Sequence, residues 1–227
     1  MNTKNKREMR RAMSIKSEIK VLLDKSSISK WGFATIRGNH GWGDSYPTAL
    51  SLILAYKKPD GEYDVGKYRS VLIEKRKMLD LIVEEIVRYL ERVGIGYKTI
   101  PHQQNPNTLK AEFPHKLAAS LAGLGWIGKS SLLITPEFGP KVRLSTVLIA
   151  ADLGAVNKVD QCQCGQCDIC GKACPYGYIH NVLWHPGMNR ENLFSPFECS
   201  AKRAEFISTI GYKHECGFCL LECPVGS

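Results

Sequence analysis

The sequence predicts an α+β protein, with a mixed helix-and-strand domain over residues 1–155 and a small cysteine-rich module over residues 156–227. Two observations lead to this division. Up to about residue 155, segments with the apolar period of a helix alternate with short apolar runs typical of strands. Beyond residue 161 lie all nine cysteines of the chain, so its end has a composition of its own.

The chain begins with basic residues that precede the first expected helix. In that helix, Ile15, Ile19, Leu22 and Leu23 fall on one face. We expect residues 1–12 to form a flexible, solvated tail, whose positive charge suits contact with nucleic acid or an acidic partner. The basic residues of this tail are Lys4, Lys6, Arg7, Arg10 and Arg11.

The mixed domain continues with two expected strands and a long helix. The strands cover residues 31–36 and 50–56, and the turn 57–61 closes the second one. The helix is amphipathic from about residue 69 to 93, and Gly94 is its expected C-terminal cap.

The second half of this domain is expected to add a short helix and three strands. A strand over residues 97–100 is followed by the polar loop 102–108 and by a helix over residues 115–121. Further strands are expected over residues 132–135 and 142–151. The last of these is almost wholly apolar, so we expect it in the middle of the sheet.

The composition of the chain is that of a globular protein. Hydrophobic residues make up 44%, enough for a buried core, and the formal net charge is +9. No apolar run approaches the ~20 residues needed to span a bilayer, so no membrane partner is expected. No secretory leader is recognised and no cysteine precedes Cys162. Both features favour a cytoplasmic location over a secreted disulfide scaffold.

Two iron–sulfur half-motifs account for the cysteines other than Cys162. The first motif is Cys164-x2-Cys167-x2-Cys170-x3-Cys174-Pro175. The second motif is Cys216-x2-Cys219-x3-Cys223-Pro224, with Cys199 upstream of it. In bacterial ferredoxins such a run gives three cysteines to one 4Fe–4S cluster and the fourth to another. The x2 gaps let the chain wrap around a cluster, and the proline stops it from folding back as a helix.

This ferredoxin-like pattern predicts two 4Fe–4S clusters and two sets of ligands. The first cysteine set comprises Cys164, Cys167, Cys170 and Cys223. The second cysteine set comprises Cys174, Cys199, Cys216 and Cys219. Cys162 is left over, because it lacks the x2 step to the next cysteine. Zinc ribbons also contain Cys-x2-Cys pairs, but four cysteines at these spacings are too crowded for one tetrahedral zinc ion.

A glycine-rich segment over residues 123–131 reads Gly-Leu-Gly-Trp-Ile-Gly-Lys-Ser-Ser. Its spacing matches that of a phosphate-binding loop. It follows an expected helix rather than a strand, however, and bulky side chains occupy the positions that would hold phosphate. Glycines permit close approach of the backbone and Trp126 offers a flat wall, which suits a bulky, mostly neutral cofactor. The alternative is a tight turn packed on the core. The cofactor-binding candidates in this segment are Gly125, Trp126, Gly128 and Lys129.

The order of these features resembles that of epoxyqueuosine reductase, a cobalamin-dependent iron–sulfur family related to reductive dehalogenases. The resemblance rests on residues 122–134, on Glu137, Phe138 and Gly139, and on the apolar strand and the two cysteine motifs that follow. It covers nearly the whole chain. It implies a nitroreductase-like cobalamin-binding domain followed by a ferredoxin-like module with two clusters.

The resemblance also implies where the cofactors lie. A base-off cobalamin is expected between the mixed domain and the cysteine module, with the second cysteine set nearest the corrin. The other cluster would receive electrons from an external low-potential donor. Leu133 and Leu144 fall at positions that contact the cofactor in the family, and Ala201 falls near another.

Two departures from the family pattern bear on the substrate. The family's aspartate proton donor, about fourteen residues before the Gly-Leu-Gly-Trp motif, falls here on Leu109. Glu112 and His115 are the candidate acids in its place, although each also suits a structural role near a helix start. The chain ends three residues after Pro224, without the family's helical-repeat domain that helps to engage tRNA.

These observations favour an oxidoreductase, namely a cobalamin-dependent iron–sulfur reductase with a small-molecule or modified-nucleoside substrate. Three alternatives remain. The chain could be an electron-transfer partner of another corrinoid protein, although the mixed domain is large for a carrier. It could reduce epoxyqueuosine in tRNA, against which the two departures argue. The last alternative is a zinc-stabilised binding module.

Overall fold

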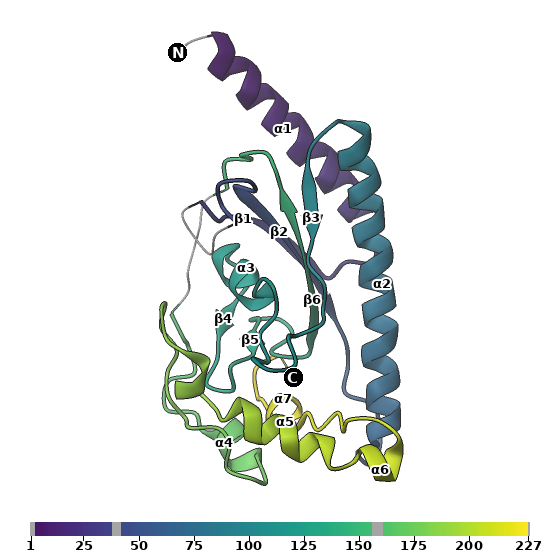
Figure 1. Ribbon diagram of the computed structural model, residues 1–227, viewed down its shortest axis with the longest axis vertical. Helices are drawn as coiled ribbons and strands as arrows, with labels where there is room; N and C mark the ends of the chain where they lie inside the picture. Colours follow the sequence, from purple (N-terminus) through teal and green to yellow (C-terminus); the bar gives the residue numbers. More distant parts are fainter. Residues whose placement is uncertain (1–2, 38–41, 156–160, 227) are drawn as a thin grey trace.

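The computed structural model describes residues 3–37, 42–155 and 161–226, and of residues 3–5 only the backbone. Its centre is a four-stranded antiparallel sheet with the order β1-β2-β6-β3 (Figure 1). The strands are β1 (Lys30–Thr35), β2 (Thr48–Ala55), β6 (Val142–Ile149) and β3 (Tyr97–Thr99). The apolar strand β6 lies between β2 and β3, so its expected place in the middle of the sheet is confirmed.

Helices cover both faces of the sheet, because β2 and β6 send apolar side chains to both sides. Two long helices, α1 (Thr3–Asp24) and α2 (Val65–Arg92), pack over Leu50, Leu52 and Val147. The short helix α3 (His115–Leu121) packs on the other face, against Ala49 and Leu148. An antiparallel sheet between helical layers confirms the expected α+β class.

The first helix differs from the expectation at its start. α1 begins at Thr3, so the described part of the tail expected to be flexible is helical. Residues 3–12 contain no glycine or proline and several strong helix formers, which explains the extension. Side chains from Lys6 to Arg11 are exposed, as a solvated tail requires, while Ile15, Ile19 and Leu23 are buried.

The boundaries of α2 follow from its caps. The Asp64 side chain accepts a hydrogen bond from the Lys67 backbone N–H at 2.7 Å and starts the helix four residues earlier than expected. Gly94 has a left-handed φ of 64°, and its N–H donates to Glu91 O at 3.0 Å. The expected C-terminal cap is therefore confirmed.

The cysteine module gathers at one end of the sheet, opposite the free end of α1 (Figure 1). Its helices are α4 (Ile169–Ala173), the 3-10 turn η1 (Arg190–Asn192), α5 (Pro196–Ala204), α6 (Ile207–Ile210) and α7 (Phe218–Leu221). The expected domain boundary after residue 155 borders residues 156–160, which lie outside the described residues. Within the described ranges, no helix is both long and apolar enough to cross a bilayer.

Candidate functional site

A cavity of about 410 Å³ lies between the mixed domain and the cysteine module. From the mixed domain, its wall receives α2, α3, β6 and residues 130–133, at the end of the glycine-rich segment and just after it. From the module it receives α5, α7 and the loops beside them. Its volume falls in the range of small-molecule sites, and both parts of the chain are needed to form it.

All four thiols of the second cysteine set belong to residues that line this cavity. These residues are Cys174, Cys199, Cys216 and Cys219. The residues of the first set are absent from the lining. The second set therefore lies nearest this cavity, and its position next to a cofactor stays a prediction drawn from the family.

Different short elements bring the second set together. Cys174 caps α4, Cys199 lies in α5, and Cys219 lies in the single turn α7. Gly217 begins α7 with a φ of 67°, and a Cβ there would lie 2.7 Å from Cε1 of Tyr68. Glycine adopts the left-handed turn and leaves room for the Tyr68 ring. The two-residue gap between Cys216 and Cys219 can therefore form this turn.

The thiols of each set lie close enough to affect one another. Burial, and then the neighbouring Cys216 and Cys199, raise the pKa of Cys219 to about 12. Burial raises the pKa of Cys170 in the first set, and its neighbours Cys164, Cys223 and Cys167 add to the rise. Thiols that disfavour one another's ionisation are stabilised when a cationic iron–sulfur core binds them.

The donor atoms therefore fit two 4Fe–4S clusters. All nine cysteines are free thiols, and their assignment to two ligand sets stays a prediction. Among the described residues, no three or more histidine, cysteine or acidic side chains converge on a single metal ion. In a cubane cluster each thiolate binds a separate corner, so its ligands stand further apart.

Cys162 lies beside Cys164 rather than in either set. A hydrogen bond between the two thiols lowers the pKa of Cys162 and raises that of Cys164. Cys162 also packs against the cluster of Ile127, Trp184 and Leu193. The structure thus gives it a packing role next to one ligand of the first set.

The glycine-rich segment forms a tight hairpin from β4 (Trp126–Ile127) and β5 (Leu133–Ile134). A Cβ on Gly125 would lie 2.2 Å from Ile134 O, and one on Gly128 would lie 2.8 Å from Ile134 Cγ1 and 3.3 Å from Cys164 Sγ. Glycine is therefore required for the hairpin and for its approach to the first cysteine set.

Sequence reasoning placed the cofactor against this hairpin, and only part of the segment lines the cavity. Trp126 is buried, 5% exposed, and Lys129 donates from Nζ to Cys167 O at 2.8 Å. Gly125, Trp126, Gly128 and Lys129 are not among the lining residues, whereas residues 130–133 are. Trp126, Gly128 and Lys129 lie beside Cys164 or Cys167 of the first cysteine set, Gly125 packs against Ile134, and residues 130–133 line the cavity.

Of the family-derived contacts, Leu133 and Leu144 line the cavity. Ala201 is not a lining residue, but its neighbour Ser200 is. Cofactor contact stays a prediction for all three positions. The two leucines also pack with Ile53, Ala119 and Leu124, so they join the cavity wall to the core.

Neither candidate acid lies in the cavity wall. Glu112 forms an ion pair with Lys98 at 2.8 Å. His115 is paired through Nδ1 with Thr146 Oγ1 at 2.9 Å and stacks on His102 at 5.3 Å. Burial, and then His102, lower the pKa of His115 to about 4. Both residues therefore have structural partners, and their catalytic role stays an untested prediction.

The loop that carries Leu109 does reach the cavity. Leu109 is a lining residue with a left-handed φ of 51°. Arg190 of η1 donates from Nη1 to Leu109 O and from Nη2 to Thr108 O, at 2.5 Å for the second. Sequence reasoning missed Arg190, because nothing in its local sequence indicates a contact with a loop eighty residues away.

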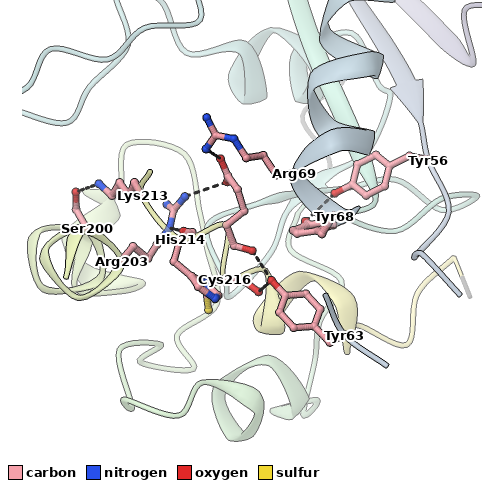
Figure 2. A network of polar contacts seen from close by, with 10 residues as sticks. Tyr56, Tyr63, Tyr68, Arg69, Ser200, Arg203, Lys213, His214 and Cys216 are labelled. Carbon is pink, nitrogen blue, oxygen red and sulfur yellow. Dashed lines mark hydrogen bonds and ion pairs between the residues drawn. The ribbon is translucent and has the colours of Figure 1, made fainter. Parts of the chain in front are cut away.

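A polar network lies around Cys216 of the second cysteine set (Figure 2). Tyr63 donates its hydroxyl to Glu215 O at 2.5 Å and to Cys216 O at 2.8 Å. The Glu215 carboxylate pairs with Arg203 at 3.2 Å and with Arg69 at 3.7 Å. These contacts attach the loop before α7 to the N-terminal part of α2 and hold Cys216 at the cavity.

No family model matches the chain. It is 32% identical over 199 residues to an epoxyqueuosine reductase from Aliivibrio fischeri, a match that covers 84% of this chain and 49% of that protein. It is 31% identical over 132 residues to the epoxyqueuosine reductase of Gloeobacter violaceus, covering 56% of this chain and 40% of that enzyme. The chain thus spans no more than about half the length of these relatives.

Solved structures share the fold. Epoxyqueuosine reductase from Streptococcus thermophilus matches 93% of this chain and 66% of its own at 22% identity and a TM-score of 0.58. An epoxyqueuosine reductase with a modified tRNA-Tyr stem loop matches 95% of this chain and 66% of its own at 19% identity and a TM-score of 0.64. A catabolic reductive dehalogenase in complex with 3-bromo-4-hydroxybenzoic acid matches 92% of this chain and 31% of its own at 16% identity and a TM-score of 0.66. The resemblance to epoxyqueuosine reductase, and with it the oxidoreductase class of the relatives, is confirmed.

Proposed function

We propose that this chain is an iron–sulfur, cobalamin-dependent reductase similar to epoxyqueuosine reductase, with a substrate still to be assigned. Two 4Fe–4S clusters, one on each cysteine set, pass electrons from an external low-potential donor to the cavity. Bound there, cobalamin supplies a strongly reducing cobalt centre. The free thiols favour a reducing compartment such as the cytoplasm.

The observation that carries this proposal is the composition of the cavity wall. One side presents the four thiols of the second cysteine set, and the other presents apolar residues such as Leu132, Leu133 and Leu144. A redox centre on one side and a largely apolar chamber on the other suit a bulky organic cofactor that receives electrons at short range.

The two sets also differ in exposure, which supports a direction for electron flow. Cys167 of the first set is exposed, whereas Cys216 and Cys219 of the second set are at most partly exposed and line the chamber. The first cluster is therefore the expected entry point for the external donor. The second cluster is the expected exit toward the cavity.

The residues of the chain have their own tasks in this scheme. Apolar side chains of the wall exclude water from the reacting atoms. The cations Arg143, Arg203 and Lys213 line the cavity and balance the negative charge that thiolate-bound clusters bring.

The test is a reconstitution under anaerobic conditions. Purified protein is loaded with iron and sulfide, mixed with cobalamin and passed over a sizing column. We expect about eight irons per chain, from two clusters of four, and co-elution of cobalamin. Protein with full iron content that does not retain cobalamin would contradict the reductase and favour the electron-transfer alternative. Zinc in place of iron would contradict both.

Matched variants sharpen this test. Cys199→Ser removes a thiol from the cavity wall, and Cys162→Ser removes one that belongs to neither set. We expect Cys199→Ser to lose cluster absorbance and cobalamin retention, and Cys162→Ser to keep both. Equal losses in the two variants would contradict the assignment of the sets.

Epoxyqueuosine in tRNA is the second candidate substrate, since the curated relatives are named epoxyqueuosine reductase. Reduction of the free epoxyqueuosine nucleoside and of the modified tRNA is compared under the same conditions. Conversion of the tRNA alone would support the tRNA enzyme. Conversion of the nucleoside alone would support a small-molecule or nucleoside reductase.

A further inference from the structure

Among the described residues, the wall of the cavity contains no carboxyl group free of a cationic partner. Leu109 occupies the loop position at which the resembled family has its proton donor, and a leucine side chain carries no proton to give. Glu215 is the one carboxylate among the described residues that line the cavity. It pairs with Arg203 at 3.2 Å and Arg69 at 3.7 Å, so both cations engage its carboxyl group.

The tyrosines at the α2 side of the cavity are poor acids. The hydroxyls of Tyr56 and Tyr68 lie 3.1 Å apart and are hydrogen-bonded to each other. Burial is the first cause that raises the pKa of both residues, and for Tyr68 the neighbouring Tyr56 adds to the rise. Each therefore keeps its proton far above neutral pH.

Lys116 is a cation in the same cavity wall as Leu109. It lies on α3, and both residues line the cavity. Its Nζ donates to Ser131 O and to Ser131 Oγ, the latter at 3.1 Å. These two bonds leave the third hydrogen of the ammonium group free. No carboxylate of the described residues acts on its charge.

The surroundings of Lys116 make its proton available near neutral pH. Burial, and then the positive charge of Arg190, lower its pKa to about 8. A general acid is most effective when its pKa lies near the working pH, because a large fraction is then protonated and the group is still acidic enough to donate its proton. Lysine is known to lose its proton readily in such buried sites.

We propose that Lys116 is the proton donor to the substrate in this cavity, in place of the carboxylate that is missing at Leu109. This role rests on the reductase function proposed above. For an epoxide substrate, two electrons from the external donor arrive through the clusters. Both carbon–oxygen bonds break, an alkene forms, and the oxygen leaves with the Lys116 proton as hydroxide. Neutral Lys116 then takes a proton from water.

The test compares three variants of the reconstituted protein. Lys116→Met removes the proton while keeping the length of the side chain. Lys116→Arg keeps the charge but holds its proton too tightly to donate. Lys110→Met removes an exposed lysine of the neighbouring loop and is the control. Iron content and cobalamin retention are measured for each variant, to separate loss of structure from loss of the acid.

The first readout is the pH profile for reduction of the epoxyqueuosine nucleoside. We expect the rate of the unaltered protein to fall as the pH rises through about 8. Lys116→Met and Lys116→Arg should be slower by about 100-fold or more and lose this inflection, while Lys110→Met should match the unaltered protein. Unchanged rates and profiles in both Lys116 variants would overturn the proposal.

The second readout does not require turnover. Protein labelled with ¹³C-lysine is titrated by NMR, and the Lys116 resonance is identified by its absence from Lys116→Met. A midpoint near 8 that moves when cobalamin is added supports the proposal. A midpoint near 10.5, or one that cobalamin leaves unchanged, overturns it. If the unaltered protein binds cobalamin but reduces no nucleoside, the choice of substrate fails and this titration alone decides the role of Lys116.

Discussion

At the scale of single residues, the backbone at Leu109 carries strain that a leucine does not relieve. A φ of 51° costs a leucine roughly 1 kcal/mol, whereas asparagine and aspartate adopt this conformation more easily. Arg190 binds the carbonyl groups of Leu109 and Thr108 and holds the loop in place. The loop is therefore held in the cavity wall although Leu109 contributes no polar side chain to it.

Leu109→Asp tests both the backbone strain at this position and the effect of a carboxylate there. The new carboxylate would relieve the backbone strain and stand in the same wall as Lys116. An anion near an ammonium group raises its pKa, so we expect the alkaline fall in the rate to move above pH 8. Leu109→Asn relieves the same strain without charge and is the control. An identical shift in both variants would show that the charge has no influence.

His115 makes the stability of the fold depend on pH. Its pKa in the folded protein is lowered to about 4, below the 6.5 of an unfolded histidine. The unfolded chain therefore binds more protons between these values, and stability is lost as the pH falls from 6.5 to 4. The loss is on the order of 3 kcal/mol. His115→Asn can still form a hydrogen bond with Thr146 and should remove this fall in the free energy of unfolding between pH 6.5 and 4, measured by denaturation at a series of pH values. The control His185→Asn, at an exposed position, should leave the fall unchanged.

At the scale of elements, the β4–β5 hairpin joins the cavity to the first cysteine set. Gly125→Ala would drive a methyl group into Ile134 O, at 2.2 Å. We expect this variant to lose both iron and cobalamin, measured by metal analysis and co-elution. Gly94→Ala is the comparison, since its Cβ would meet no atom within 4 Å and only the left-handed φ is strained. It should lower the melting temperature by a few degrees, for a cost of about 1 kcal/mol, and keep both cofactors.

Tyr63 tests the attachment of the loop that carries Cys216. Tyr63→Phe removes hydrogen bonds to Glu215 O and Cys216 O and should cost about 1 kcal/mol of stability. We expect faster loss of iron to a chelator, followed by the decay of cluster absorbance. Tyr89→Phe serves as control, because no hydrogen bond is described for that hydroxyl. Equal rates of iron loss in both variants would mean that the network is not needed to hold the second cluster.

The elements also differ in how well the sequence alone predicts them. Period and capping predicted α2, α3 and β6, because their apolar faces and end residues lie in the local sequence. The spacing of the cysteines predicts two ligand sets, because it suits the shape of a cubane site, and this assignment stays a prediction. The places of Lys116 and Arg190 were not predictable, since long-range packing brings both to the cavity. Trp126 was expected to offer a flat wall to the cofactor; it is buried and is not a lining residue of the cavity, and its contact with a cofactor stays a prediction.

At the scale of the whole molecule, the cavity exists only where the two parts of the chain meet. Removal of the clusters should therefore affect more than electron transfer. We expect the iron-free protein to melt at a lower temperature and to lose cobalamin binding, because α5, α7 and their loops form half of the wall. Calorimetry and equilibrium dialysis before and after chelation measure the two effects. Unchanged cobalamin affinity in the iron-free protein would contradict this dependence.

The hairpin has a consequence for anyone who mutates the first cysteine set. On one side of the hairpin, Gly128 lies close to Cys164, and Lys129 donates a hydrogen bond to the Cys167 backbone carbonyl. Residues 130–133 of the same segment line the cavity. Under the proposed function, a change at the first cysteine set is expected to reach the cavity through this single covalent segment. A substitution at Cys164 or Cys167 is therefore expected to alter the shape of the cavity as well as electron transfer. A slow variant at either position does not by itself show that electron transfer is interrupted.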